Sequence, residues 1–199
     1  MKKYLGIVLL ATVIVLAACG GGAEEKIEPN ISEEVNDFTF TTQDNEKLSL
    51  EDLKGDYWVA DFIFTNCTSV CIPMTSNLVK LQQKAKEEDI NIQFVSFSVD
   101  PANDTPEVLT SYAKDYKADL DNWTFLTGYD FQTIKEFSIK SFKSMVAPPP
   151  EGEDQVYHGT SFFLVNPEGT AIKKYNGVQA DSMDQILTDL KVLGLSEKK

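Results

Sequence analysis

The sequence from Tyr57 to Cys71 reads YWVADFIFTNCTSVC. Its first eight residues form an almost continuous apolar run, which is typical of a strand that is covered on both faces of a sheet. Two cysteines follow, four residues apart, and apolar residues then recur at helical spacing within Thr75 to Glu88. The segment therefore predicts a buried strand that leads through two cysteines into a helix.

The rest of the chain alternates between strand patterns and helix patterns. Hairpins are predicted where two short runs flank a polar turn, at Phe38–Thr42 with Lys47–Leu50 and at Thr160–Val165 with Ala171–Tyr175. The periodicity also predicts two strands and three helices, at Ile90–Val99, Trp123–Leu126, Thr105–Lys117, Phe131–Phe142 and 182–193. We therefore expect an α/β fold, with a mixed sheet flanked by helices and an N-terminal hairpin extension. This order of elements, with a cysteine pair at the start of a helix, resembles the thioredoxin-like fold.

The N-terminus has the pattern of an export signal. Two lysines precede an apolar stretch from Tyr4 to Ala18, which is shorter than the ~20 residues of a spanning helix. Its end, Leu16-Ala17-Ala18-Cys19, resembles the lipobox of bacterial lipoproteins. This resemblance implies that residues 1–18 are a signal peptide that is removed and that Cys19 carries a lipid; the alternative is an ordinary signal peptide with an unmodified cysteine.

These features predict the organisation and location of the mature protein. Residues 19–36 contain little periodic apolar sequence, so we expect the lipidated cysteine to be followed by a flexible tether. The thioredoxin-like domain is then expected over residues 37–199. Two acyl chains give lasting attachment to a bilayer, which places this domain at the extracytoplasmic face of the bacterial cell membrane.

The charge of the chain excludes one class of partner. The formal net charge is −13, from 18 lysines, no arginine and 31 acidic residues. An acidic surface without arginine repels a polyanion and offers no bidentate clamp for phosphate, so nucleic acid is not an expected partner. The sequence also contains no nucleotide-binding loop and no pattern of a Ser/His/Asp hydrolase.

Cys67 and Cys71 form an even pair once Cys19 is assigned to lipid. At the start of a helix, residues four apart face the same side with Cβ atoms ~5–6 Å apart, so the two sulfurs can share a metal ion or close a disulfide. A helix N-terminus also favours the thiolate, which binds metals and attacks disulfides. Three interpretations stay open: a metal site, a redox-active pair, and a disulfide that only stabilises an exported domain.

His158 is the only histidine in the chain. It directly precedes Gly159 and a predicted strand, where thioredoxin-like proteins usually carry a cis-proline that packs over the cysteine pair. We therefore expect the imidazole to lie beside the thiols. Two thiolates and an imidazole form a soft ligand set that suits Cu(I) and, with rearrangement, Cu(II) or zinc.

Two acidic residues and two methionines lie near these ligands in the predicted fold. Asp61, six residues before Cys67, is expected either to tune thiol protonation from beneath or to be a structural, hydrogen-bonded carboxylate. Asp100 precedes a proline and is expected to shape a turn near the site, as a possible outer neighbour of the ligands. Met74 and Met145 are interpreted as packing residues.

Three blocks together resemble the Sco (SenC) family. They are Asp61 to Met74 with its Cys-x-x-x-Cys, Ser96 to Pro101, and His158, in the order and spacing of that family over roughly residues 36–195. The resemblance implies that Cys67, Cys71 and His158 bind copper, as Cu(I) or Cu(II) or both. Many members have a proline directly after the second cysteine, whereas this chain has Ile72 and then Pro73.

The resemblance also implies a partner and a function. Members load copper into the dinuclear copper site of cytochrome c oxidase subunit II outside the membrane, and a copper donor must exist whose identity the sequence does not give. The first hypothesis is thus a copper-binding assembly factor. The alternative is a thiol–disulfide oxidoreductase that acts on exported proteins, with Cys67 and Cys71 as its catalytic residues. A redox sensor or a non-catalytic binding module is the third.

Overall fold

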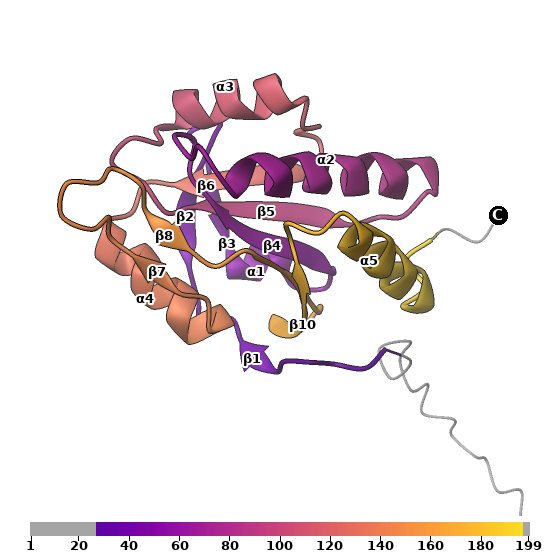
Figure 1. Cartoon of the computed structure of the whole chain (residues 1–199). Coiled ribbons are helices and arrows are strands. Elements are labelled where there is room, and N and C mark those ends of the chain that lie inside the picture. The colour runs from indigo at the N-terminus through magenta and orange to yellow at the C-terminus, as the bar shows by residue number, and fades with distance from the viewer. Residues whose placement is uncertain (1–26, 197–199) are drawn as a thin grey trace, which may run out of the picture.

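The structure is a computed structural model, and it describes residues 27–196. Eight strands form one mixed sheet in the order β1-β10-β9-β4-β5-β6-β2-β3, and two short strands, β7 and β8, pair beside it (Figure 1). The elements in chain order are β1 (Glu33–Glu34), β2 (Thr39–Thr42), β3 (Lys47–Ser49), α1 (Leu50–Leu53), β4 (Trp58–Ile63), α2 (Cys71–Glu87), β5 (Gln93–Ser98), α3 (Pro106–Tyr116), β6 (Trp123–Thr127), α4 (Phe131–Phe142), β7 (Val146–Ala147), β8 (Tyr157–His158), β9 (Ser161–Val165), β10 (Thr170–Asn176) and α5 (Asp181–Val192).

Strand β4 is the centre of the molecule. It pairs in parallel with β5 and antiparallel with β9, and all six of its residues are buried. Successive side chains of a strand point to opposite faces, so β4 contributes to two cores. Val59 and Ile63 pack toward α2, α3 and α5, whereas Ala60 and Phe62 pack toward α4. The expected mixed sheet with helices on both faces is confirmed, and Figure 1 shows α2 and α3 above the sheet and α4 below it.

The N-terminal hairpin is confirmed and is part of the sheet. Strand β2 pairs antiparallel with β3 and, on its other side, with β6, so the hairpin extends one edge. Helix α3 starts as its sequence indicates, with the Thr105 hydroxyl accepting from the backbone N–H of Val108 and Pro106 at the first helical position. Helix α4 has the predicted bounds, and its N-cap is Asp130.

The predicted flexible tether over residues 19–36 is wrong from Ile27 onward. Strand β1 pairs with β10, with Glu33 opposite Ala171, and the side chains of Ile27 and Val35 are buried in the two cores. Ile31, which lies between them, packs against the second core. Three apolar residues at intervals of four and the pairing with β10 thus hold this polar segment on the domain. The predicted signal peptide and Cys19 lie outside the described residues.

Helix α2 begins later than the cysteine pair suggests. Cys71 is its first residue, and Cys67 lies in the loop between β4 and α2, so the pair does not share a helical turn. Among residues 27–196, no helix has the length and apolarity needed to span a bilayer.

Candidate metal centre

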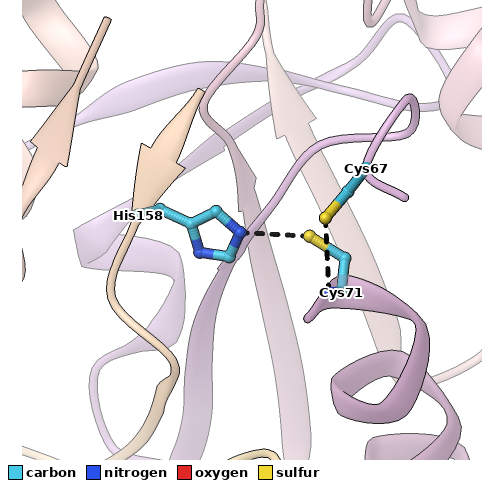
Figure 2. A group of neighbouring side chains, drawn as sticks. All are labelled: Cys67, Cys71 and His158. Carbon is cyan, nitrogen blue, oxygen red and sulfur yellow. Dashed lines mark hydrogen bonds between the residues drawn. The ribbon is translucent and has the colours of Figure 1, made fainter. Parts of the chain in front are cut away.

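Three side chains from separate elements converge at the end of β4. Cys67 comes from the loop after β4, Cys71 from the first position of α2, and His158 from the end of β8. Their ligand atoms all lie within 4.8 Å of one another, and Cys71 Sγ is 3.0 Å from His158 Nε2 (Figure 2). The structure thus brings together the three residues that the sequence predicts as ligands, although Cys71 and His158 are 87 positions apart in the chain.

The two thiols are chemically unequal. The Cys71 thiol donates a hydrogen bond to Cys67, and together with smaller contributions from His158 and backbone N–H groups this lowers the pKa of Cys67 to about 3. The same hydrogen bond and burial raise the pKa of Cys71 far above its usual range. The backbone N–H of Cys71 also donates to Cys67 Sγ over 3.4 Å. The thiolate is therefore located on Cys67 and the proton on Cys71, and both cysteines are free of disulfides in the structure.

The ring of His158 is oriented by the backbone. Its Nδ1 lies 2.9 Å from the carbonyl oxygen of Gly159. A carbonyl only accepts, so Nδ1 carries a hydrogen, and Nε2 is the ring nitrogen that faces the thiols. Ligating histidines are commonly fixed in this way, by a hydrogen bond from the nitrogen that does not bind the metal. Phe64 contacts the imidazole edge-to-face, with 5.8 Å between ring centroids.

Gly159 allows the histidine strand to approach the turn that follows α4. A Cβ atom at this position would lie 2.5 Å from Ser144 Oγ, closer than real Cβ contacts. The N–H of Gly159 donates to the carbonyl of Met145 at 2.9 Å, which continues the pairing of β7 with β8. Glycine therefore fits here because the Ser144 hydroxyl occupies the space that a Cβ atom would need. Met145, expected to pack, is exposed, whereas Met74 is fully buried.

The loop that carries Cys67 is held from the sheet by Asp104. This buried carboxylate accepts from the hydroxyl of Thr65 at 2.6 Å, from its backbone N–H, and from the hydroxyl of Ser98. Burial raises the pKa of Asp104, while these hydrogen bonds oppose the rise. Asp100 accepts from the side chain of Asn103 and shapes the turn before α3, as expected, and its role as an outer neighbour of the ligands stays a prediction.

Asp61 lies in the buried centre of β4. Its Oδ1 accepts from Ser96 Oγ, which in turn accepts from the indole N–H of Trp123. Within residues 27–196, Oδ2 has no hydrogen-bond partner. Burial raises the pKa of Asp61 to about 7, and the hydrogen bond from Ser96 and the charge of His158 limit this rise. The structure therefore contains the hydrogen-bonded, buried carboxylate that the second of our two interpretations describes.

A small cavity opens beside Cys67. Its volume is about 230 Å³, and it lies between the cysteine loop and the segment that leads into β8, lined among others by Phe64, Val70, Val156 and Tyr157. Cys67 lines this cavity, whereas Cys71 is only 1% exposed. The centre is therefore open on the side of Cys67.

The donor set fits copper. One sulfur is already disposed to ionise, the other is adjacent to it, and Nε2 of the imidazole lies within ligand distance of both. Thiolates and imidazole are ligands that Cu(I), Cu(II) and zinc accept, and carboxylate ligands of harder cations do not take part in the cluster.

A thioredoxin-like sheet whose Cys-x-x-x-Cys loop and distal histidine meet at one point defines a thioredoxin-fold protein with a three-ligand centre for soft metals. The chain belongs to the SCO1/SenC family, whose model matches residues 28–193. The match starts close to Ile27, where the described fold also starts.

Known proteins agree with this assignment over most of the chain. The SCO1 protein homolog of Bacillus subtilis (strain 168) is 48% identical, with 96% of this chain and 97% of that protein covered. A SCO1/SenC family lipoprotein from Bacillus anthracis is 46% identical, with a TM-score of 0.78 over 83% of this chain and 97% of that one.

Two further structures carry information on function. BsSco, described as a member of the Sco family of cytochrome c oxidase assembly proteins and as containing a disulfide switch, is 50% identical, with a TM-score of 0.76 over 84% of this chain and 96% of that one. Yeast Sco1 with copper bound is 25% identical, with a TM-score of 0.65 over 80% of this chain and 89% of that one.

Proposed function

We propose that this protein binds one copper ion through Cys67, Cys71 and His158 and delivers it to the dinuclear copper site of cytochrome c oxidase subunit II. The observation that carries the proposal is the approach of two sulfurs and one imidazole nitrogen to within 4.8 Å. Support comes from the family, because a relative is described as an oxidase assembly protein and another has copper bound.

The protonation of the centre suits uptake of a metal ion. Cys67 offers a thiolate at the open side, and Cys71 gives up its proton when the metal binds, since metals bind the deprotonated sulfur. His158 completes the set through Nε2. Two thiolates suffice for Cu(I), whereas Cu(II) gains more from the imidazole, so the same centre can hold both oxidation states.

The proposed location is the extracytoplasmic face of the cell membrane, with Cys19 as the lipid anchor. The lipobox-like sequence supports it, and so does the B. anthracis relative, which is described as a lipoprotein. Because the domain includes Ile27, seven residues separate it from Cys19. Seven residues span at most ~25 Å, which would keep the metal centre near the membrane surface where an oxidase subunit is exposed.

The direct test is copper binding by the reduced protein, followed by an assay in cells. The reduced protein is expected to bind close to one copper ion per chain, and Cys67→Ser or Cys71→Ser to abolish tight binding. His158→Ala is expected to lower the affinity for Cu(II) by more than about 100-fold. Loss of a residue that only contacts a ligand lowers metal affinity by less than that. In a deletion strain, added copper should restore oxidase activity; undiminished Cu(II) binding by His158→Ala would reject the three-ligand centre.

The unequal thiols favour a second candidate, a thiol–disulfide oxidoreductase that prepares the cysteines of subunit II. The Cys67 thiolate would attack one sulfur of a partner disulfide and release the other as a thiolate. Cys71 would then displace the partner, leaving a Cys67–Cys71 disulfide and a partner that has gained two electrons. This activity does not need the imidazole as a ligand. Reduction of a disulfide-bonded subunit II fragment at wild-type rate by His158→Ala, with no rescue of the deletion strain by copper, would favour it.

A further inference from the structure

Gln155 bridges the two parts of the chain that carry the copper ligands. It lies three residues before His158, and its half-buried side chain reaches across to the cysteine loop. The amide Nε2 donates to the carbonyl of Asn66 at 3.1 Å, and Oε1 accepts from the backbone N–H of Thr68 at 3.2 Å. Asn66 and Thr68 are the two neighbours of Cys67, so one amide group holds the backbone on both sides of this cysteine.

The loop has few other restraints on this side. Helix α2 has no side-chain hydrogen bond at its N-cap, Val70, and Asp104 holds the loop only at Thr65. Asn66 and Thr68 are exposed, while Cys67 between them is buried. Gln155 therefore supplies the hydrogen bonds that, among the described residues, join the backbone on both sides of Cys67 to the segment before His158.

The segment that carries Gln155 is continuous with the histidine strand. Val156 is buried in the core beside α4, and Tyr157 and His158 pair with β7. Before Gln155, the chain runs through an exposed, proline-rich and acidic loop, residues 148–154. Of residues 155–158, Gln155 is the one whose side chain hydrogen-bonds to the backbone of the cysteine loop.

We propose that Gln155 is a positioning residue of the metal centre, which holds His158 within ligand distance of Cys67 and Cys71 by bracketing Cys67. The inference rests on the proposed copper site and adds a residue that binds no metal itself. A side-chain amide is the suitable group, because its nitrogen can donate to the carbonyl of Asn66 while its oxygen accepts from the N–H of Thr68. Loss of partners that orient metal ligands typically lowers metal affinity by about 10- to 100-fold.

The test is a double-mutant cycle on the full, reduced protein with Cu(II) as the probe. Gln155→Met keeps the length of the side chain and removes its hydrogen bonds to Asn66, Thr68 and Asp154. It is expected to weaken Cu(II) binding by about tenfold and to shift the copper absorption bands. In a His158→Ala background the same change is expected to have no further effect, because the residue acts through the histidine. Gln155→Glu, which still accepts from Thr68 but cannot donate to Asn66, should fall between wild type and Gln155→Met.

Gln185→Met, at an exposed glutamine of α5, is the matched control and should bind Cu(II) as wild type does. A copper-free measurement completes the test: in Gln155→Met the amide of Thr68 should exchange its hydrogen faster, and the ring signals of His158 should shift. Wild-type Cu(II) affinity in Gln155→Met, or equal losses with and without His158, would overturn the inference and leave the copper site intact. If His158→Ala binds Cu(II) as tightly as wild type, the copper site itself is rejected. In that case, unchanged Thr68 exchange and unchanged His158 ring signals in copper-free Gln155→Met would reject the positioning role as well.

Discussion

Replacing Asp61 with asparagine should change the pH dependence of stability in a defined direction. Burial raises the pKa of this carboxyl from 3.8 to about 7, so ionising it in the folded protein costs free energy. At about 1.4 kcal/mol for each tenfold change in proton affinity, the interval corresponds to about 4 kcal/mol. Because the folded pKa is the higher one, stability from this group is complete below pH 3.8, falls as pH rises, and is lost above about 7.

Asparagine removes this dependence but has its own cost. Its oxygen can accept from Ser96 as Oδ1 does, while its amide replaces Oδ2, which has no partner among the described residues. An unsatisfied buried amide costs about 1–3 kcal/mol. Asp61→Asn should therefore be less stable than wild type at pH 4 by about 1–3 kcal/mol and more stable at pH 8 by a similar amount.

Urea unfolding of the reduced protein at both pH values measures the difference, with Asp121→Asn at an exposed site as control. The expected change in the relative stability of Asp61→Asn between pH 4 and pH 8 is about 4 kcal/mol in its favour. The same relative stability at both pH values would show that Asp61 is ionised in the fold throughout and would refute this account of the buried carboxylate.

Three further predictions follow from individual contacts. Cys67 should react with iodoacetamide at nearly its full rate at pH 5, because its pKa is lowered to about 3, while Cys71 stays unreactive. Mass spectrometry of the alkylated protein measures both rates, and parallel reaction of the two cysteines near pH 8.5 would contradict this. Asp104→Asn cannot accept from Thr65 and Ser98 together as the carboxylate does, so unfolding should cost about 1–3 kcal/mol less, and Cys71 should become open to alkylation; wild-type values in both assays would exclude this role. Gly159→Ala should destabilise by about 1–3 kcal/mol through the clash with Ser144, and Ser144→Ala should restore most of that loss in the double variant; an additive loss on thermal unfolding would argue against it.

The sequence predicts most of the fold because its apolar patterns are strong. The buried run of β4, the helix α4 and both predicted hairpins are present in the structure, since burial on one or two faces imposes a period that composition alone reveals. The packed segment from Ile27 to Val35 was missed, because three isolated apolar residues in a polar stretch resemble a linker until the sheet edge that they cover is known.

The site is predicted in its ligands and missed in its supports. Cysteine and histidine are rare residue types with specific chemistry, and the family resemblance connects Cys67, Cys71 and His158 across the chain. Asp104 and Gln155 are common residue types in polar segments, and only the folded backbone shows that they hold the cysteine loop. The expected lowering of thiol pKa is present at Cys67, but its largest cause is the hydrogen bond from Cys71 rather than a helix N-terminus.

The central claim, a copper ion held by two sulfurs and one imidazole, is tested most directly by X-ray absorption at the copper edge. Copper-loaded wild-type protein should show two sulfur scatterers and one imidazole, and His158→Ala should lose the imidazole signal while keeping both sulfurs. His158 is the only histidine of the chain, so His158→Ala has no imidazole left to bind copper. A spectrum without sulfur, or an imidazole signal that survives in His158→Ala, would contradict the assignment of the centre.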